Sequence, residues 1–138
     1  MIAGITSRLV ACRRGVSAVE MALMLTLFLG LLFGIINFSL VLWTQASLYF
    51  AAQAAARCAS VNVTNCGTKG ATETYAMNQY FGQSLGEANP FTYTLVPAPG
   101  CGHQVAASYD YPLSIPFYGD YRLLLSANAC FPAGGSTG

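Results

Sequence analysis

The chain has 138 residues, of which 54% are hydrophobic and 8% are charged, and its formal net charge is +1. A chain of this length holds one globular domain at most. Because no basic patch follows the first fourteen residues, the composition argues against a nucleic-acid partner.

The longest apolar stretch extends from residue 21 to residue 43, and no charged residue occurs between Glu20 and Arg57. Its polar interruptions are Thr26, Asn37 and Ser39. This stretch is long enough and apolar enough to span a bilayer. Since the first proline is Pro90, we expect one continuous helix over residues 16–59, about 65 Å long. Its membrane-spanning part would cover about residues 21–43.

Residues 1–15 contain basic but no acidic side chains and predict a leader peptide. Gly15 has no side chain to obstruct a narrow protease cleft, although it is also an ordinary loop residue ahead of a helix. Cleavage after Gly15 would create a new ammonium group at Val16.

Glu20 has two interpretations. With Ser17 as N-cap it completes a Ser-x-x-Glu capping box. It also stands at the entrance of the apolar stretch, where an unpartnered carboxylate costs on the order of 2.5–3.5 kcal/mol. If the chain is cut after Gly15, a Glu20 carboxylate can pair with the Val16 ammonium of a neighbouring copy. We therefore expect Glu20 to act in processing or assembly.

Three residues in the apolar stretch are candidates for helix packing. Gly30 and Gly34 form a G-x-x-x-G pair, which permits close approach of a second helix. Asn37 can donate a hydrogen bond across helices or to its own backbone. The following residues 44–59 are rich in alanine, which favours continuation of the helix beyond the bilayer and close packing against it.

Four of the five cysteines follow the apolar stretch, namely Cys58, Cys66, Cys101 and Cys130. The arginines before that stretch predict a cytoplasmic N-terminus, so these cysteines reach an oxidising compartment. Of the three possible pairings we favour Cys58–Cys66 and Cys101–Cys130. Zinc is the competing interpretation, but no CxxC or HxxxH spacing exists and His103 is the only histidine. We therefore expect no metal site.

Residues 60–138 predict a small α+β head stapled by disulfides. A polar loop is expected over residues 61–69 and an amphipathic helix over residues 70–85, ended by Gly86. Strands are expected at 91–96, at about 105–111 and at 121–130, with a turn at 97–102, a loop at 112–120 and a tail after 130. The three strands would form an antiparallel sheet beside the long helix.

The sequence offers no support for an enzyme. The carboxylates of the head are scattered, and a single histidine gives little scope for acid–base catalysis. We expect no catalytic residue and no cofactor. The informative chemistry is done to this chain, through proteolysis at Gly15–Val16 and oxidation of its cysteines.

A resemblance to a known family is carried by Arg14-Gly15-Val16-Ser17-Ala18-Val19-Glu20-Met21-Ala22-Leu23, by Gly34-Ile35-Ile36-Asn37-Phe38 and by Ala55-Ala56-Arg57. This pattern resembles the TadE-like family, the pseudopilins of tight-adherence (Tad, type IVb-like) pilus systems. Two residues depart from it: Met21 stands where an aromatic residue often follows the glutamate, and Asn37 where an acidic residue is frequent.

The resemblance implies cleavage after Gly15 by a prepilin peptidase, and a processing or assembly role for Glu20. It implies a single-pass protein of the bacterial inner membrane, with a cytoplasmic N-terminus and a periplasmic head. Its partners would be membrane lipid, the peptidase and other pilins or pseudopilins, and it would either stay in the inner membrane or be incorporated in the pilus. The alternatives are a small disulfide-rich binding domain secreted after cleavage near Ala54, where Ala52-Gln53-Ala54 resembles a signal-peptidase site, or an uncleaved membrane-anchored module.

Overall fold

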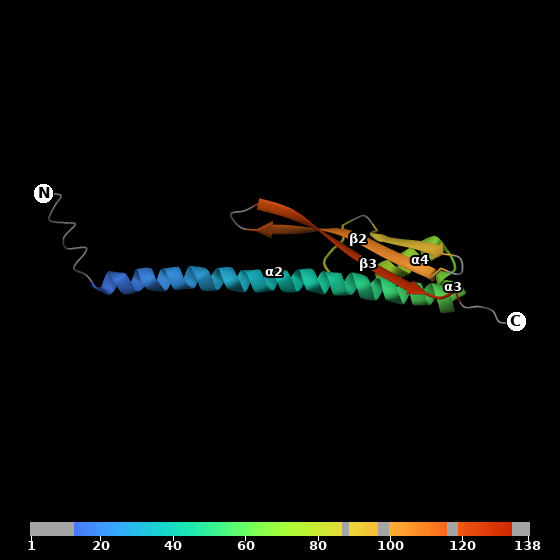
Figure 1. Cartoon of the computed structure of the whole chain (residues 1–138), viewed down its shortest axis with the longest axis horizontal. Helices are drawn as coiled ribbons and strands as arrows, with labels where there is room; N and C mark the ends of the chain where they lie inside the picture. The colour runs from blue at the N-terminus through green and yellow to red at the C-terminus, as the bar shows by residue number, and fades with distance from the viewer. Residues whose placement is uncertain (1–12, 87–88, 97–99, 116–118, 134–138) are drawn as a thin grey trace. The chain divides into compact units, whose positions relative to one another are not determined.

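The computed structural model describes residues 13–86, 89–96, 100–115 and 119–133. Its elements are drawn in Figure 1 and follow the order α2 (Arg13–Val61), α3 (Val63–Cys66), α4 (Lys69–Gln79), β1 (Phe91–Val96), β2 (Gly102–Ile115) and β3 (Gly119–Phe131). The predicted leader up to residue 12, the turn residues 97–99 and the tail from residue 134 lie outside the described residues. The chain divides into two compact units, Met1–Ser39 and Leu40–Gly138, and we call the second the C-terminal unit.

The predicted long helix is confirmed as α2, which has 49 residues and contains no proline. It begins at Arg13, three residues before the predicted start, so Ser17 lies inside the helix and the predicted N-cap there is wrong. In the described part of the chain, α2 is the one helix long and apolar enough to cross a membrane by length and composition.

The core of the C-terminal unit is built on an alanine face of α2. The fully buried residues of this face follow the i, i+3, i+4, i+7, i+8 spacing of one helical stripe and are Leu48, Ala51, Ala52, Ala55 and Ala56. They share one hydrophobic cluster with inward residues of the sheet, including Val105, Ala107, Ala127 and Ala129. Small side chains on both surfaces allow the sheet to approach the helix closely, as the alanine content predicts.

The predicted three-stranded antiparallel sheet is confirmed, with strand order β1-β2-β3. β1 has the predicted bounds, but the predicted loop at 112–120 is wrong, because β2 continues through Pro112, opposite Arg122, to Ile115. The N–H of Ser108 donates to the Pro90 carbonyl on the β1 side of β2. Residue 112 faces that same side by alternation, and β1 begins with Phe91 opposite Ala107, so it pairs with no residue of β2 beyond that point. At residue 112 the backbone N–H that proline lacks would point to the edge of β2 that β1 does not cover. Proline is tolerated at such an edge.

The segment between α2 and β1 also differs from the prediction. The predicted loop at 61–69 contains the short helix α3, and the predicted helix at 70–85 ends at Gln79. Tyr80 caps α4 with an extended backbone (φ −77°, ψ 130°), so Gly86 does not end the helix. At its other end, the Thr68 hydroxyl oxygen accepts from the Ala71 N–H at 3.3 Å.

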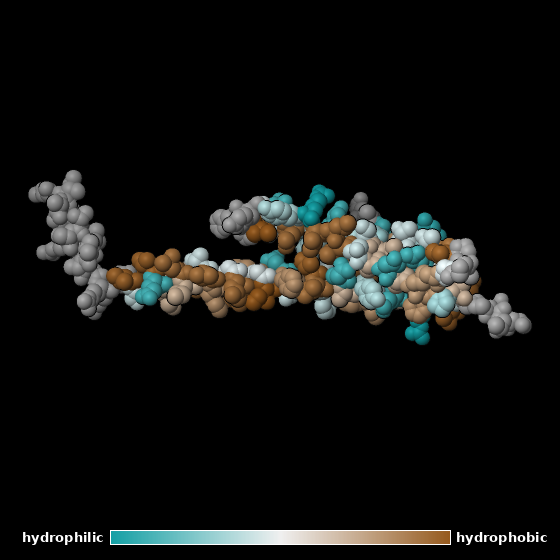
Figure 2. Space-filling model, viewed as in Figure 1, coloured by the Kyte–Doolittle hydropathy of each residue, from teal (hydrophilic) through white to brown (hydrophobic). Residues whose placement is uncertain are grey.

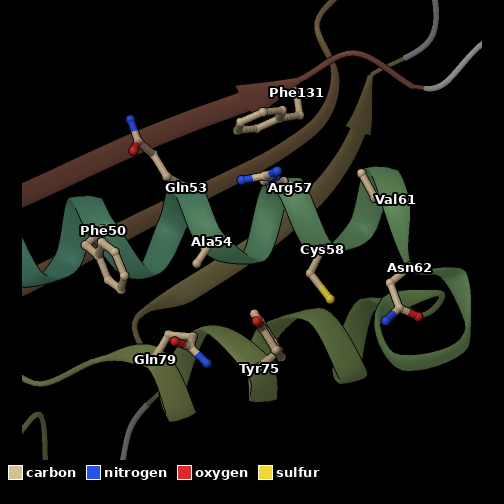
Figure 3. Close-up of a pocket in the computed structure, with 10 residues that line it drawn as sticks. All are labelled: Phe50, Gln53, Ala54, Arg57, Cys58, Val61, Asn62, Tyr75, Gln79 and Phe131. Carbon is tan, nitrogen blue, oxygen red and sulfur yellow. The ribbon is translucent and has the colours of Figure 1, made fainter.

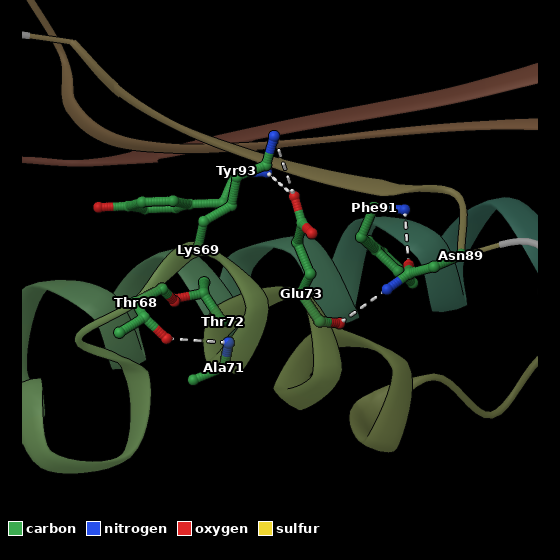
Figure 4. A network of polar contacts seen from close by, with 8 residues as sticks. All are labelled: Thr68, Lys69, Ala71, Thr72, Glu73, Asn89, Phe91 and Tyr93. Carbon is green, nitrogen blue, oxygen red and sulfur yellow. Dashed lines mark hydrogen bonds and ion pairs between the residues drawn. The ribbon is translucent and has the colours of Figure 1, made fainter.

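Glu73 joins α4 to β1, as Figure 4 shows. Its carboxylate accepts from the Tyr93 N–H at 3.0 Å and lies 3.9 Å from the Lys69 ammonium. The Asn89 amide donates to the Glu73 carbonyl at 3.4 Å and accepts from the Phe91 N–H at 2.9 Å. The Glu73 side chain is 19% exposed and holds the first strand against α4.

Replacing Ala55 with leucine tests the alanine face of α2. Ala55 is fully buried, so the added side chain forces the sheet away from the helix, and we expect a loss of about 1–3 kcal/mol in the free energy of unfolding. The measurement is denaturant unfolding of the full chain in detergent. Ala54→Leu is the matched control, because Ala54 lines an open groove one residue away. Equal losses in both variants would contradict this packing.

Tyr80 predicts a stability change at alkaline pH. Burial, with a smaller contribution from Tyr109, raises the pKa of Tyr80 from 10.0 to about 12, and its hydroxyl donates to the Gln83 carbonyl at 2.7 Å. The folded state thus holds the proton more tightly than the unfolded state. This stabilisation is fully present below pH 10 and is lost as the pH rises towards 12. The unfolding midpoint of Tyr80→Phe should fall less than that of the parent chain over this range. Parallel curves would show that Tyr80 does not titrate as described.

Candidate functional site

The candidate processing residues lie in the first turns of α2. Gly15 and Val16 are helical, and the Val16 side chain is 67% exposed. Glu20 follows Val16 by four residues, which places both on one face of the helix, about 6 Å apart along its axis. The Glu20 side chain is exposed and has no ion-pair partner within the described residues. The structure therefore brings the predicted cleavage position and the predicted carboxylate together.

The polar side chains of the apolar stretch are satisfied within the helix. Thr26, Asn37 and Ser39 each donate to the carbonyl four residues earlier, at 2.8 Å. Of the two options predicted for Asn37, the structure shows the bond to its own backbone, at Phe33. Such bonds lower the cost of placing these groups in lipid, and the Glu20 carboxylate just before the stretch has no such bond.

Gly30 and Gly34 lie one turn apart on an open surface of α2. A Cβ built on either glycine would meet no atom within 4 Å. The two positions thus remain available for close approach of another helix, as the G-x-x-x-G spacing predicts.

The apolar half of α2 displays its large side chains instead of burying them. The exposed large hydrophobic residues from Val16 to Trp43 have exposures between 38% and 74%, and Figure 2 shows them as a brown surface on the viewed face of the helix. A water-soluble surface rarely exposes so much contiguous apolar area. This surface is suited to lipid or to neighbouring helices.

An aromatic cluster marks the start of the C-terminal unit. Trp43 lies edge-on to Phe81, with ring centroids 5.5 Å apart, and its indole N–H donates to the Phe81 carbonyl at 3.4 Å. Phe50 meets the same ring at 5.6 Å. Trp43 is 56% exposed, and an amphipathic ring in this position is typical of a membrane boundary.

Both predicted disulfides are present. Cys58–Cys66, with a Cα–Cα distance of 5.8 Å, ties the end of α2 to α3. Cys101–Cys130, with a Cα–Cα distance of 5.9 Å, joins the residue before β2 to β3. The lone histidine, His103, stacks on Tyr93, and its Nδ1 lies 2.7 Å from the tyrosine hydroxyl. The His103 ring is thus held by its neighbour in the sheet.

The C-terminal unit has a groove of about 560 Å³ that was not predicted from the sequence. Figure 3 shows its floor, the exposed face of α2, with Arg57 standing beside Phe131 on one side and Tyr75 of α4 on the other. The exposed residues Phe50, Gln53 and Arg57 recur at helical spacing, which is the only signal of this groove in the sequence.

Comparison with known proteins gives a match to this helix. Residues 15–57 match the family model described as TadE-like protein. No curated protein and no solved structure matches the chain. The matched segment begins at Gly15, contains Glu20 and the whole apolar surface, and ends at Arg57 on the alanine-rich half of α2. The resemblance is thereby confirmed over residues 15–57, which are similar to the TadE-like family.

Proposed function

We propose that the chain is a pseudopilin of a Tad-type pilus, cut by a prepilin peptidase between Gly15 and Val16. The TadE-like segment supports a membrane-anchored, Tad pilus-associated protein. The observation that carries the finer proposal is the continuity of α2. One helix contains the cleavage position, an apolar span and the core face of a disulfide-bonded unit. In this proposal the N-terminus is cytoplasmic and the C-terminal unit faces the periplasm.

Glu20 is the assembly group in this proposal. Thr26, Asn37 and Ser39 are satisfied by their own helix, whereas the Glu20 carboxylate at the entrance of the apolar stretch has no ion-pair partner within the described residues. Cleavage after Gly15 places an ammonium on Val16, one turn before Glu20 and on the same face. A neighbouring copy carries the same two charged groups. The Glu20 carboxylate of one copy can therefore pair with the Val16 ammonium of the other, and neither charge is left unpaired in lipid.

The secreted alternative is less well supported. Cleavage near Ala54 would cut α2 within its buried alanine face and remove Leu48, Ala51 and Ala52 from the core of the C-terminal unit. A released product would lose this packing. The same helix therefore supports retention of the anchor, and we propose a structural role for the protein instead of a catalytic one.

Intact mass and N-terminal sequence of the protein from membranes of its native host test the processing step. We expect a chain that begins at Val16, since the leader lies before the peptidase site. A chain that still begins at Met1 would contradict processing, and a soluble product beginning near Ala55 would establish the secreted alternative.

Substitution of Glu20 tests the assembly role. In Glu20→Gln the side chain keeps its size but loses its charge, so we expect the protein to insert and fold but to lose incorporation into pili. The measurement is the amount of this chain in sheared pilus fractions, with the N-terminal sequence determined in parallel. Thr26→Val is the matched control, since Thr26 bonds only its own helix and its loss should leave incorporation unchanged. Normal incorporation of Glu20→Gln would overturn the role assigned to the carboxylate.

A further inference from the structure

The groove of about 560 Å³ in the C-terminal unit has no task in the proposed function. α2 forms its floor, α4 lies on one side and the end of β3 on the other, as Figure 3 shows. All three parts belong to one compact unit, residues 40–138. The volume lies in the range of ligand sites, about 300–1,000 Å³. We call it the Arg57 groove, and its lining includes Phe50, Arg57 and Val61 of α2, Tyr75 and Gln79 of α4, and Phe131 of β3.

Arg57 is the one charged side chain that lines this groove. The ion pair within the described residues joins Lys69 to Glu73, so the Arg57 guanidinium has no acidic partner there. Arg57 is exposed, and Figure 3 shows it beside Phe131 at the rim. A guanidinium presents a planar fork of donors that matches the two oxygens of a carboxylate. The charge of the groove therefore favours a carboxylate ligand.

Neutral polar groups surround this cation. Gln53 of α2 and Tyr75 and Gln79 of α4 line the same groove and make no hydrogen bond within the described residues. Tyr75 and Gln79 are half-buried, and half-buried polar groups need a partner in water or in a ligand. A glutamine carboxamide offers donors and an acceptor together, which is the set that pairs with a peptide group. The groove can thus bond the backbone of an extended chain.

The floor of the groove is long and apolar at both ends. Phe50 and Val61 are 50% and 76% exposed, and they are eleven residues apart on one helix. The distance along the axis is about 16 Å, which about five residues of extended peptide span. Arg57 and the carboxamides lie between these ends. The lining is therefore apolar, then polar and charged, then apolar again.

We infer that the Arg57 groove binds an extended segment of another protein, with an acidic residue near its middle and apolar side chains at its ends. An acidic saccharide fits less well, because its hydroxyl groups would lie against Phe50 and Val61 without hydrogen-bond partners. A lipid headgroup is too distant. Arg57 follows Trp43 by fourteen residues of the same helix, about 21 Å beyond the boundary that Trp43 marks.

This chain does not supply the segment from its described residues. Its acidic residues there lie in helices or in paired strands, namely Glu20, Glu73, Asp110 and Asp120. The sequence after Ala133 is Gly-Gly-Ser-Thr-Gly, which has neither an acidic nor an apolar side chain. The occupant is thus a partner protein. The inference goes beyond the proposed function, because it gives the C-terminal unit a binding task separate from the anchoring and assembly role of α2.

Selection from random seven-residue peptides displayed on phage tests the inference. The bait is the full chain in detergent, as the parent or as Arg57→Glu. We expect the parent to enrich peptides with one acidic residue between apolar residues, and Arg57→Glu to enrich basic peptides instead. Arg122→Glu is the matched control, since Arg122 is an exposed arginine of the same unit that lies outside the groove. It should select the same peptides as the parent.

Fluorescence anisotropy of one selected peptide gives a second measurement. Arg57→Gln should weaken its binding about tenfold or more, because a charge-assisted pair is lost. Ala54→Leu should also weaken it, since Ala54 lines the groove and the larger side chain would fill it. Both variants should keep the parent unfolding midpoint and both disulfides, which separates loss of the groove from loss of the fold.

Four results would overturn the inference. They are no enrichment over the random library, the same acidic peptides selected by Arg57→Glu, binding of polygalacturonate in place of the peptides, and self-association of the parent chain that the selected peptide abolishes. The third would assign the groove to an acidic polysaccharide, and the fourth to a second copy of the chain. None of them bears on cleavage after Gly15, so the processing step and the groove are tested separately.

Discussion

The structure depends on one helix that meets two different environments without interruption. A helix satisfies its backbone hydrogen bonds internally, so α2 can pass from an apolar solvent into a protein core with no change of backbone. Its two parts differ in which side chains they expose and which they bury. Large residues such as Leu27 and Phe38 are exposed in the first part, and small ones such as Ala51 and Ala55 are buried in the second. This is the reverse of a water-soluble helix, because the first part is suited to lipid or to other helices.

A core built largely from alanine contributes less burial per residue than one built from leucine, which explains where the covalent bonds lie. Burial stabilises roughly in proportion to apolar area, and a small domain with little of it commonly needs disulfides. Cys58–Cys66 follows directly after the alanine face. Cys101–Cys130 links the start of β2 to the end of β3. The alanines of α2 thus have two consequences. They let the sheet approach the helix closely, and they leave a small buried area that needs disulfides.

Features fixed by local pattern were predictable, and features fixed by distant neighbours were not. The continuity of α2 and the bounds of β1 follow from apolar content and alternation, and Glu20 is conspicuous as one charge before a long apolar stretch. The predicted loop at 112–120 was wrong because the sequence does not show which edge of β2 lacks a neighbour. The predicted helix over residues 70–85 included Phe81, which lies beyond the end of α4 and packs on Trp43 and Phe50. The groove beside Arg57 was not predicted for the same reason, since residues of α2, α4 and β3, which are distant in the sequence, line it together.

Within the proposed function, the charged and apolar contacts of α2 have separate tasks. An apolar stripe repeats at every turn, so a neighbouring surface could shift by about 5.4 Å along the helix and still meet leucine, isoleucine or phenylalanine. Burial there supplies affinity but selects no register. A single carboxylate that must meet a single ammonium has no equivalent position one turn away, and a lone charge left in lipid is penalised. One polar group in an apolar helix contact can thus fix its register. Glu20 would set the position of each copy, and the apolar surfaces would hold it there.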